Sequence, residues 1–279
     1  MSVVITPQAM SKGIEFTGVD LTPKAEKTGA TVVLKVFWKT TSFWSDSDIA
    51  EYHEQAPSII ERLTVEQYWN KEGAISNNKL TCEDFALRVL CEFASKRGLP
   101  VVLKTGVRTY KNMEVYSPEQ HDRYSSTMYG FSEMVMLTYG APDMQRVDEN
   151  TVVVSEVSAL KPGDILALIR DIPMKTRAHH IQMAFKVAAT RVDIRQGNTG
   201  GWSTQPWTAV RNVMGKNMAD PQNEGYAGMP IESGYFEKGA VGWDYHNTSA
   251  NSFNNDYLKN FDLFRWNFFE FNGMCGKPV

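Results

Sequence analysis

Residues 81–86 (Thr-Cys-Glu-Asp-Phe-Ala) place a cysteine in what the pattern predicts to be the first turn of a helix. Threonine is a favoured N-cap residue, and an acid three residues later is typical of a capping box. The helical spacing continues to Lys96, and Gly98 and Pro100 predict that the helix ends there. A thiol at a helix N-terminus faces the positive end of the helix dipole, which favours the nucleophilic thiolate.

The other cysteines limit what this thiol can be. Most cysteines are small buried hydrophobes, and Cys91, nine residues after Cys82, points to the opposite side of the helix and is expected in the core. The three cysteines (the third is Cys275) are too few for a disulfide scaffold, and their spacing with the five histidines fits no zinc pattern. We therefore expect a free thiol, no metal and no cofactor. Glu83 and Asp84 act against a low thiol pKa.

Residues 160–198 supply candidates for a base and its partner. A turn ending in Gly163-Asp164 leads into an apolar strand, and a second strand begins at His180 with Ile181, Met183, Phe185 and Val187 on one face. A third strand, residues 191–196, ends at the polar side chains of Gln196 and Asn198. The pattern predicts a small antiparallel sheet on which the cysteine helix packs. Strand phase favours His180 over His179 as the base, because His179 falls on the face of Ile181.

These motifs resemble those of the NlpC/P60 cysteine peptidases. Residues 82–86 are similar to the family's Cys-x-x-Phe-aliphatic helix start. Residues 160–166 (Leu-Lys-Pro-Gly-Asp-Ile-Leu), followed by His-Ile-Gln-Met-Ala from His180, resemble its Pro-Gly-Asp and histidine-strand signature. The end of the third strand resembles the related CHAP amidases, with Gln196 in the position of their Glu and Asn198 matching their Asn. The resemblance covers residues 80–99 and 160–198.

The resemblance implies an α+β fold with a papain-like core and the hydrolysis of amide bonds in peptidoglycan stem peptides. Cys82 would attack the carbonyl, His180 would accept and return the proton, and Asn198 or Gln196 would orient the imidazole. The backbone N–H of Cys82 would help to stabilise the oxyanion. Cys82 and His180 are 98 residues apart, which predicts an insertion between residues 105 and 156.

The domain organisation follows from the same motifs. We expect residues 1–72 to pack on the core, residues 73–200 to form it with that insertion, and residues 201–279 to be an extension of the same domain, rich in glycine, tryptophan and other aromatic residues. Within these parts, the spacing predicts a helix over residues 57–70, long loops over 197–207 and 215–242, and a strand over 263–271. Trp202 and Trp207 are candidates for lining a substrate groove.

Composition narrows the choice of partners and location. A net charge of −3 without a basic block argues against nucleic acid as a partner, and no apolar run is long enough to span a membrane. The N-terminus has no signal-peptide pattern, so synthesis in the cytoplasm and export by another route are expected. An antibacterial effector of a type VI secretion system, acting in the periplasm of a rival cell, fits these features. That hypothesis implies a secretion-apparatus carrier and an immunity or inhibitor protein as partners.

Two alternatives remain at the level of sequence. Residues 82–106 also resemble the transglutaminase-like core, in which a cysteine helix is followed by an Arg-Gly-Ile-Pro turn. That resemblance implies deamidation, crosslinking or proteolysis of proteins, but it requires His-x-Trp where His180 is followed by Ile-Gln. The second alternative is a non-catalytic binding or structural protein on the same fold.

Overall fold

The computed structural model describes residues 2–5, 32–66, 68–70, 73–75, 79–197, 219–222 and 226–274. It has an α+β fold, with both helices and strands. The helices are α2 (Asp46–Val65), α3 (Cys82–Arg97), α4 (Pro118–His121), α5 (Met128–Met136) and α7 (Phe268–Met274), with 3-10 helices η1 (Ala141–Gln145), η2 (Val157–Ala159) and η3 (Leu258–Asn260). The first nine strands are β1 (Ser2–Ile5), β2 (Val32–Val36), β3 (Tyr68–Asn70), β4 (Gly73–Ile75), β5 (Lys79–Leu80), β6 (Val102–Lys104), β7 (Thr109–Lys111), β8 (Met113–Val115) and β9 (Thr151–Val153). The others are β10 (Ile165–Leu168), β11 (His180–Ala188), β12 (Arg191–Gln196), β13 (Met229–Pro230), β14 (Glu232–Lys238), β15 (Trp243–Asn247), β16 (Ser252–Asn254) and β17 (Phe261–Trp266).

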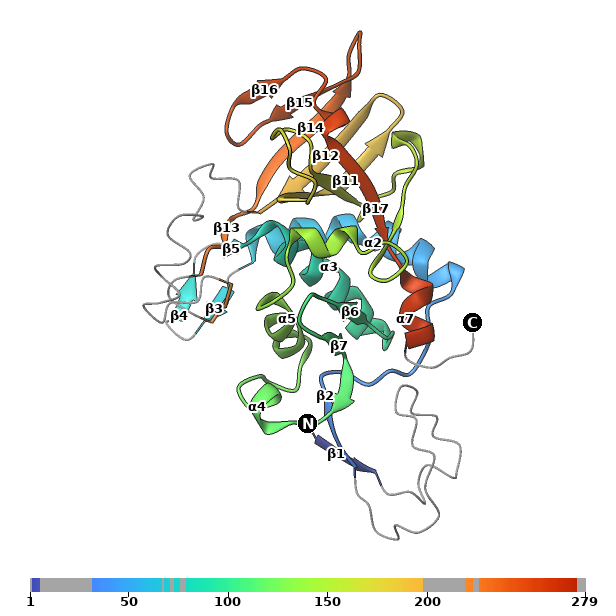
Figure 1. Cartoon of the computed structure of the whole chain (residues 1–279), viewed down its shortest axis with the longest axis vertical. Helices are drawn as coiled ribbons and strands as arrows, with labels where there is room; N and C mark the ends of the chain where they lie inside the picture. The colour runs from blue at the N-terminus through green and yellow to red at the C-terminus, as the bar shows by residue number, and fades with distance from the viewer. Residues whose placement is uncertain are drawn as a thin grey trace.

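The main sheet is antiparallel and has eight strands in the order β16-β15-β14-β12-β11-β10-β17-β9. It forms the upper part of the molecule in Figure 1, with α2 and α3 running beneath it and α5, β6 and β7 below these helices. The sheet is larger than the sequence predicts. The expectation of loops over residues 215–242 is wrong for β13 and β14, and β15 and β16 extend the sheet further.

The strands alternate between two buried clusters, one on each face of the sheet. On β10, Ile165 and Ala167 belong to the cluster that contains the side chains of α2 and α3, whereas Leu166 and Leu168 belong to the cluster on the other face. On β11, Ile181, Met183 and Phe185 join the helix-side cluster, as predicted. The prediction for Val187 is wrong, because a bulge between Ala184 and Lys186 reverses the alternation and packs Val187 against the other cluster.

Helix α3 has the ends that the sequence predicts. Thr81 is the N-cap, and its side-chain oxygen accepts a hydrogen bond from the backbone N–H of Asp84 (3.4 Å). Gly98 ends the helix in the left-handed conformation (φ 64°), and its N–H and that of Leu99 bond to carbonyls of the last turn. Because the helix is buried against the sheet and α5, its side chains are fixed and Cys82 has a defined position.

Helix α2 begins well before the predicted start at Pro57. Ser45 forms a capping box with Asp48, in which each residue's side chain bonds the backbone N–H of the other (3.3 and 3.1 Å). This box starts the helix at Asp46, and Pro57 lies inside it. The predicted helical end at Asn70 is also wrong, because Asn70 lies in β3. Within the predicted helix, Ile59, Ile60 and Leu63 lie in the core cluster that includes side chains of β11 and α3, whereas Val65 is exposed.

The Gly163-Asp164 turn fixes the start of β10. Gly163 has φ 87°, and a Cβ at this position would come within 2.7 Å of the Tyr52 ring, so only glycine fits without strain. The fully buried Asp164 carboxylate accepts hydrogen bonds from the N–H of Lys161 (2.7 Å) and from the guanidinium of Arg265 (2.7 and 2.8 Å). The turn thereby joins β10 to β17.

The predicted strand over residues 263–271 is only partly present. Strand β17 ends at Trp266 and α7 begins at Phe268. Phe268 and Phe271 are three residues apart, so a helix can bury both rings, and Phe268 packs on Trp44 with ring centroids 4.4 Å apart. Aromatic residues suit strands and buried helices equally, and periodicity over so short a segment does not separate the two.

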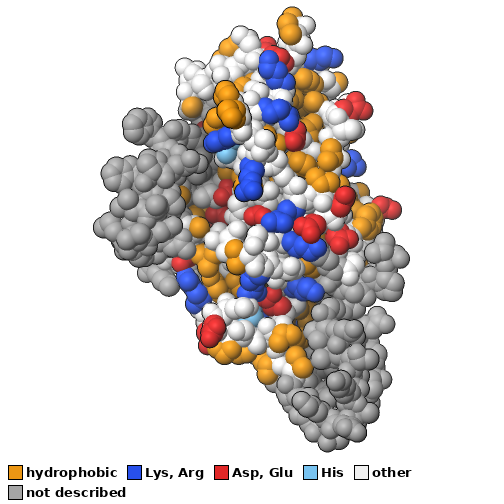
Figure 2. Space-filling model, viewed as in Figure 1, with side chains coloured by type: hydrophobic (Ala, Val, Ile, Leu, Met, Phe, Trp, Pro, Cys, Tyr) orange, Lys and Arg blue, Asp and Glu red, His pale blue; other side chains and the backbone are white. Residues whose placement is uncertain are grey.

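The described part of the chain contains no helix that is long and apolar enough to cross a membrane. On the face shown in Figure 2, lysine and arginine side chains lie among acidic, polar and hydrophobic ones and form no continuous basic surface. That mixed distribution is in keeping with the small net charge of the chain.

Candidate active site

Cys82 is the first residue of α3, at the end that points to the main sheet. The first helical N–H groups have no intrahelical acceptor, and the first helical bond beyond the cap runs from Phe85 N to Thr81 O (3.0 Å). The backbone N–H of Cys82 therefore has no acceptor within the helix, whereas that of Glu83 donates to the carboxylate of its own residue. This is the electrostatic setting that favours an anion at a helix N-terminus.

Three chain segments meet over the start of this helix. Strand β5, which leads into Thr81, pairs with β13, and Gly197 at the end of β12 lies so close to Leu80 and Thr81 that a side chain at position 197 would collide with their backbone. The hydroxyl of Tyr226 accepts a hydrogen bond from the N–H of Thr81 (3.1 Å) and donates one to Asp84 (2.6 Å). As a result Cys82 is only 5% exposed.

The thiol is held in its protonated form in this conformation. Its Sγ donates a hydrogen bond to Oε2 of Glu83 (2.8 Å). Burial, and then the charge of Glu83, raise the pKa of Cys82 well above its usual range, although a hydrogen bond from the backbone of Ile181 acts in the opposite direction. Burial first, and the adjacent acids second, therefore outweigh the helix dipole and favour the neutral thiol here.

The acids beside the thiol are themselves perturbed. Burial raises the pKa of Glu83, and the nearby charge of Asp143 adds to the effect. Burial together with the charge of Glu83 raises the pKa of Asp84 well above its usual range. The side chain of Asp84 bonds to Tyr226 and not to the N–H of Thr81, so the predicted capping box is half formed.

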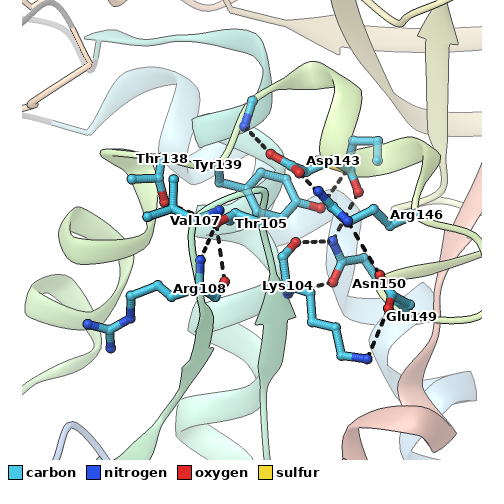
Figure 3. A network of polar contacts seen from close by, with 12 residues as sticks. Lys104, Thr105, Val107, Arg108, Thr138, Tyr139, Asp143, Arg146, Glu149 and Asn150 are labelled. Atoms are coloured by element: carbon cyan, nitrogen blue, oxygen red, sulfur yellow. Dashed lines mark hydrogen bonds and ion pairs between the residues drawn. The ribbon is translucent and has the colours of Figure 1, made fainter.

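Asp143 belongs to a rigid polar network that is shown in Figure 3. Its carboxylate accepts hydrogen bonds from the N–H of Gly140 (3.0 Å) and from Nε of Arg146 (2.7 Å). Asn150 bonds both the backbone N–H and C=O of Lys104 (2.8 and 2.7 Å) and the carbonyl of Asp143 (3.0 Å). These bonds fix Asp143, and with it a negative charge near Glu83.

His180 and Gln196 lie together on neighbouring strands. Nε2 of His180 is 2.9 Å from Oε1 of Gln196, and the same oxygen accepts a hydrogen bond from Nε2 of Gln182 (2.8 Å). The amide nitrogen of Gln196 donates to the hydroxyl of Tyr245 (3.0 Å) and faces Oε2 of Glu232 (3.4 Å). Gln182, Gln196 and Tyr245 are all buried.

This network determines the protonation of the imidazole. A carboxylate is only an acceptor, so the Gln196 atom that faces Glu232 must be its NH₂ group, and the atom that faces His180 must be its oxygen. Nε2 of neutral His180 is therefore the N–H donor, and Nδ1 carries the lone pair. Burial lowers the pKa of His180, which favours the neutral ring that a general base requires.

The thiol and the imidazole lie at the same end of β11 but on opposite faces of the sheet. His180 lies opposite Leu168 in register and so faces the sheet side away from α3, while the sulfur is hydrogen-bonded to the backbone of Ile181, the next residue. Among the described residues, the side-chain hydrogen bond of Sγ is with Glu83 and not with the ring of His180. Transfer of the thiol proton to Nδ1 would require the Cys82 side chain to leave Glu83 and to reach the ring around the end of β11.

His179, the rival base, is engaged elsewhere. It precedes β11, its Nε2 is 2.9 Å from the carboxylate of Asp171, and its N–H bonds the carbonyl of Leu168 (3.1 Å). Asn198, the other proposed orienting residue, lies outside the described residues, as do Trp202 and Trp207. Of the four candidate residues, Cys82, His180 and Gln196 thus lie around one strand end, while Asn198 is not described.

Sequence reasoning missed Gln182, Tyr226, Glu232 and Tyr245. Gln182 follows His180 by two residues, so strand alternation alone places it on the same face. Tyr226 and Glu232 fall within residues 215–242, whose glycine, asparagine and proline content predicts a loop, and Tyr245 follows that segment.

Within the described residues, the candidate site does not line the hollow on the main sheet, and it holds no cluster of metal ligands. A hollow of about 610 Å³ lies along β9 and β17, and no candidate site residue lines it. The described residues hold no group of three or more His, Cys, Asp or Glu side chains suited to a metal ion.

No protein-family model, curated protein or solved structure that was compared with the chain matches it. Its function must therefore be inferred from the geometry around Cys82 and His180.

Proposed function

We propose that the protein is a cysteine hydrolase with a papain-like core, and that it cleaves amide bonds. The observation that carries the proposal is the side-chain arrangement at the end of β11. Gln196 holds the Nε2–H of His180 and leaves the lone pair on Nδ1, and the thiol of Cys82, at a helix N-terminus, lies against the backbone of the next residue, Ile181. A nucleophile, a base and an orienting group on three rigid elements are the minimum that such chemistry needs.

The reaction would proceed in two halves. The thiol proton of Cys82 moves to Nδ1 of His180, the sulfur forms a bond to the substrate carbonyl carbon, and the backbone N–H of Cys82 helps to stabilise the oxyanion. The imidazolium then gives its proton to the leaving amine as the C–N bond breaks. Water, deprotonated by His180, hydrolyses the resulting thioester and regenerates the thiol.

The proposed substrate is the peptide stem of peptidoglycan, and the proposed role is that of an antibacterial effector. The support is the resemblance of residues 80–99 and 160–198 to NlpC/P60 and CHAP motifs. Delivery by a type VI secretion system to the periplasm of a target cell, with an immunity protein in the producing cell, belongs to the same proposal.

Incubation of the purified protein with isolated sacculi, followed by mass analysis of the soluble fragments, tests the substrate. We expect new fragments whose masses correspond to scission within or at the base of the stem peptide. Sacculi that release no fragment beyond those of a buffer control would contradict a cell-wall substrate. If Cys82 still reacts with an electrophile, a transglutaminase-like action on protein glutamine remains, measurable as ammonia release.

One observation favours the non-catalytic alternative. The Cys82 thiol is buried, bonded to Glu83 and has a raised pKa, as expected for a structural cysteine. The polar network around His180 argues against it, because four buried or partly buried polar side chains that fix one imidazole tautomer have no evident purpose in a passive sheet.

A further inference from the structure

Gln196 occupies a position where the resemblance predicts a carboxylate, and it has no charge of its own. A neutral amide orients the ring of His180 but contributes little to stabilising the imidazolium that forms when the ring accepts a proton. In a cysteine hydrolase of this design, a negative charge behind the orienting group would supply that stabilisation. The structure contains such a charge within reach of Gln196.

Glu232 lies directly opposite Gln196 in the register of β12 and β14. Its Oε2 is 3.4 Å from the amide nitrogen of Gln196 and accepts a hydrogen bond from Nδ2 of Asn247 (2.9 Å). Asn247 is buried, with 7% of its surface exposed, and its own oxygen accepts from the N–H groups of Ser249 and Ala250 (3.0 and 2.9 Å). Asn247 is therefore rigid and holds the carboxylate toward β12.

The chain also ties Glu232 to the cysteine helix. Two residues before it, β13 ends, and β13 pairs with β5, whose last residue directly precedes Thr81. Strand β14 then places Glu232 beside Gln196. The segment from β13 to the start of β14 thus pairs with the strand that leads into α3 and also places the Glu232 carboxylate next to Gln196.

We propose that Glu232 is a positioning residue of the site, which provides through Gln196 the negative charge that stabilises protonated His180. This inference rests on the proposed function. When the S–H bond of Cys82 breaks and an N–H bond forms at Nδ1 of His180, the positive charge spreads over the ring and lies near the Glu232 carboxylate. No proton crosses Gln196, whose amide only transmits the orientation.

There is a physical reason for a neutral amide, and not a carboxylate, between His180 and Glu232. Gln196 serves two donors with its oxygen and two acceptors with its NH₂ group, which a carboxylate at position 196 could not do. A carboxylate there would also be buried against Tyr245 and would lie beside Glu232, at the cost of desolvation and repulsion. Glu232, at the partly exposed edge of the cluster, carries the charge at a lower cost.

Other charged groups also face His180 and must be held constant in a test. They are the ion pair of His179 and Asp171 in the segment before β11 and the Tyr245 phenol on β15, which bonds Gln196. Burial and the charge of His179 lower the pKa of His180, whereas the negative charges of Glu232 and Asp171 raise it. Substitution of Glu232 by glutamine keeps the shape and one acceptor oxygen, which can still accept from Gln196 and Asn247, and removes the charge.

Nitrogen-15 NMR of the imidazole rings in the intact protein tests the proposal, with the His180 signals assigned from a His180→Ala variant. In Glu232→Gln we expect the pKa of His180 to fall while the neutral ring keeps its Nε2–H tautomer. The double variant Gln196→Glu, Glu232→Gln moves the negative charge from position 232 to position 196, which contacts the ring. Its His180 pKa should therefore be higher than that of the single variant. Glu237 is an exposed carboxylate on the same strand, so Glu237→Gln is the matched control. In this variant His180 should have the same pKa as in the wild type.

An unchanged His180 titration in Glu232→Gln would overturn the inference, because a purely structural carboxylate would not move the pKa of the ring. For hydrolysis, the same variant should lose about 10-fold in kcat/KM and shift the acidic limb of the pH profile. The NMR result does not need turnover. A second result is a wild type that cleaves no substrate while Glu232→Gln still lowers the pKa of His180. That result would contradict the proposed function but would leave the electrostatic role of Glu232 intact.

Discussion

Replacement of His180 by alanine should reduce the rate of amide hydrolysis about 10³-fold or more, and replacement of Cys82 by alanine should abolish it. The first change removes the imidazole that Gln196 orients at the end of β11, the strand end against which Cys82 also lies. The second removes the atom that forms the covalent intermediate. The measurement is the initial rate of fragment release from sacculi, or of ammonia release if the substrate proves to be protein glutamine.

Two matched variants separate chemistry from stability. Cys91→Ala makes the same change on the same helix, at a side chain that is fully buried and whose pKa burial raises to about 12. It should keep the activity of the wild type. His179→Ala breaks the ion pair with Asp171 and should cost far less than His180→Ala. The reverse order of the two histidine variants would reassign the base to His179.

Replacement of Glu83 by glutamine should increase the rate at which iodoacetamide alkylates Cys82 at pH 7 about 10-fold or more. Glu83 raises the thiol pKa through its charge and its hydrogen bond, so its removal lowers that pKa. Each unit of decrease raises the thiolate fraction tenfold as long as the thiol remains mostly protonated. The rise of the alkylation rate with pH should accordingly begin at lower pH in the variant than in the wild type.

Glu61→Gln, which neutralises an exposed carboxylate on α2, provides the control for a simple change of net charge and should leave the alkylation profile in place. Equal profiles for the wild type and Glu83→Gln would mean that Glu83 does not hold the thiol. If the profile shifts as expected, Glu83 keeps the nucleophile inactive until its hydrogen bond is released. A bound substrate could break that bond by displacing the Glu83 side chain from the sulfur.

Local signals predicted the cysteine helix and the histidine strand well. The Thr81 cap and the Gly98 end of α3 depend on side chains within a few residues of each terminus, which is the range that sequence patterns report. The start of β11 at His180 and the burial of Ile181 and Met183 follow from simple alternation. The proximity of Gln196 to His180 then follows from two consecutive antiparallel strands joined by a tight turn.

The carboxyl-terminal strands escaped prediction because their composition conceals their pattern. Glycines at positions 234, 239 and 242 break the sequence into short pieces, and yet Phe236 and Tyr245 are buried and face each other across β14 and β15. The pairing of β14 with β12 joins residues about 40 positions apart, and single-sequence propensities carry no information about such a partner. Glu232 and Tyr245 could therefore not be connected to His180 from the sequence.

Non-local packing also decided the state of the thiol. The helix dipole favours a thiolate at Cys82, and the sequence alone offers Glu83 and Asp84 as the opposing charges. The outcome depends on how far these three side chains are buried, and that burial comes from Gly197, Tyr226 and β13, all far away in the chain. Desolvation is the largest influence on all three pKa values, and it cannot be read from neighbouring residues.

The most direct measurement is the reaction of the native protein with a short peptide that carries a vinyl sulfone in place of the scissile amide, followed by intact-mass analysis and mapping of the adduct. The peptide occupies the site as a substrate would, so the Cys82 side chain can leave Glu83 before it reacts. The account predicts one adduct per chain, on Cys82, formed far more slowly in His180→Ala. An adduct on Cys91 or Cys275 instead, or the same rate with and without His180, would contradict the assignment of Cys82 and His180 as nucleophile and base.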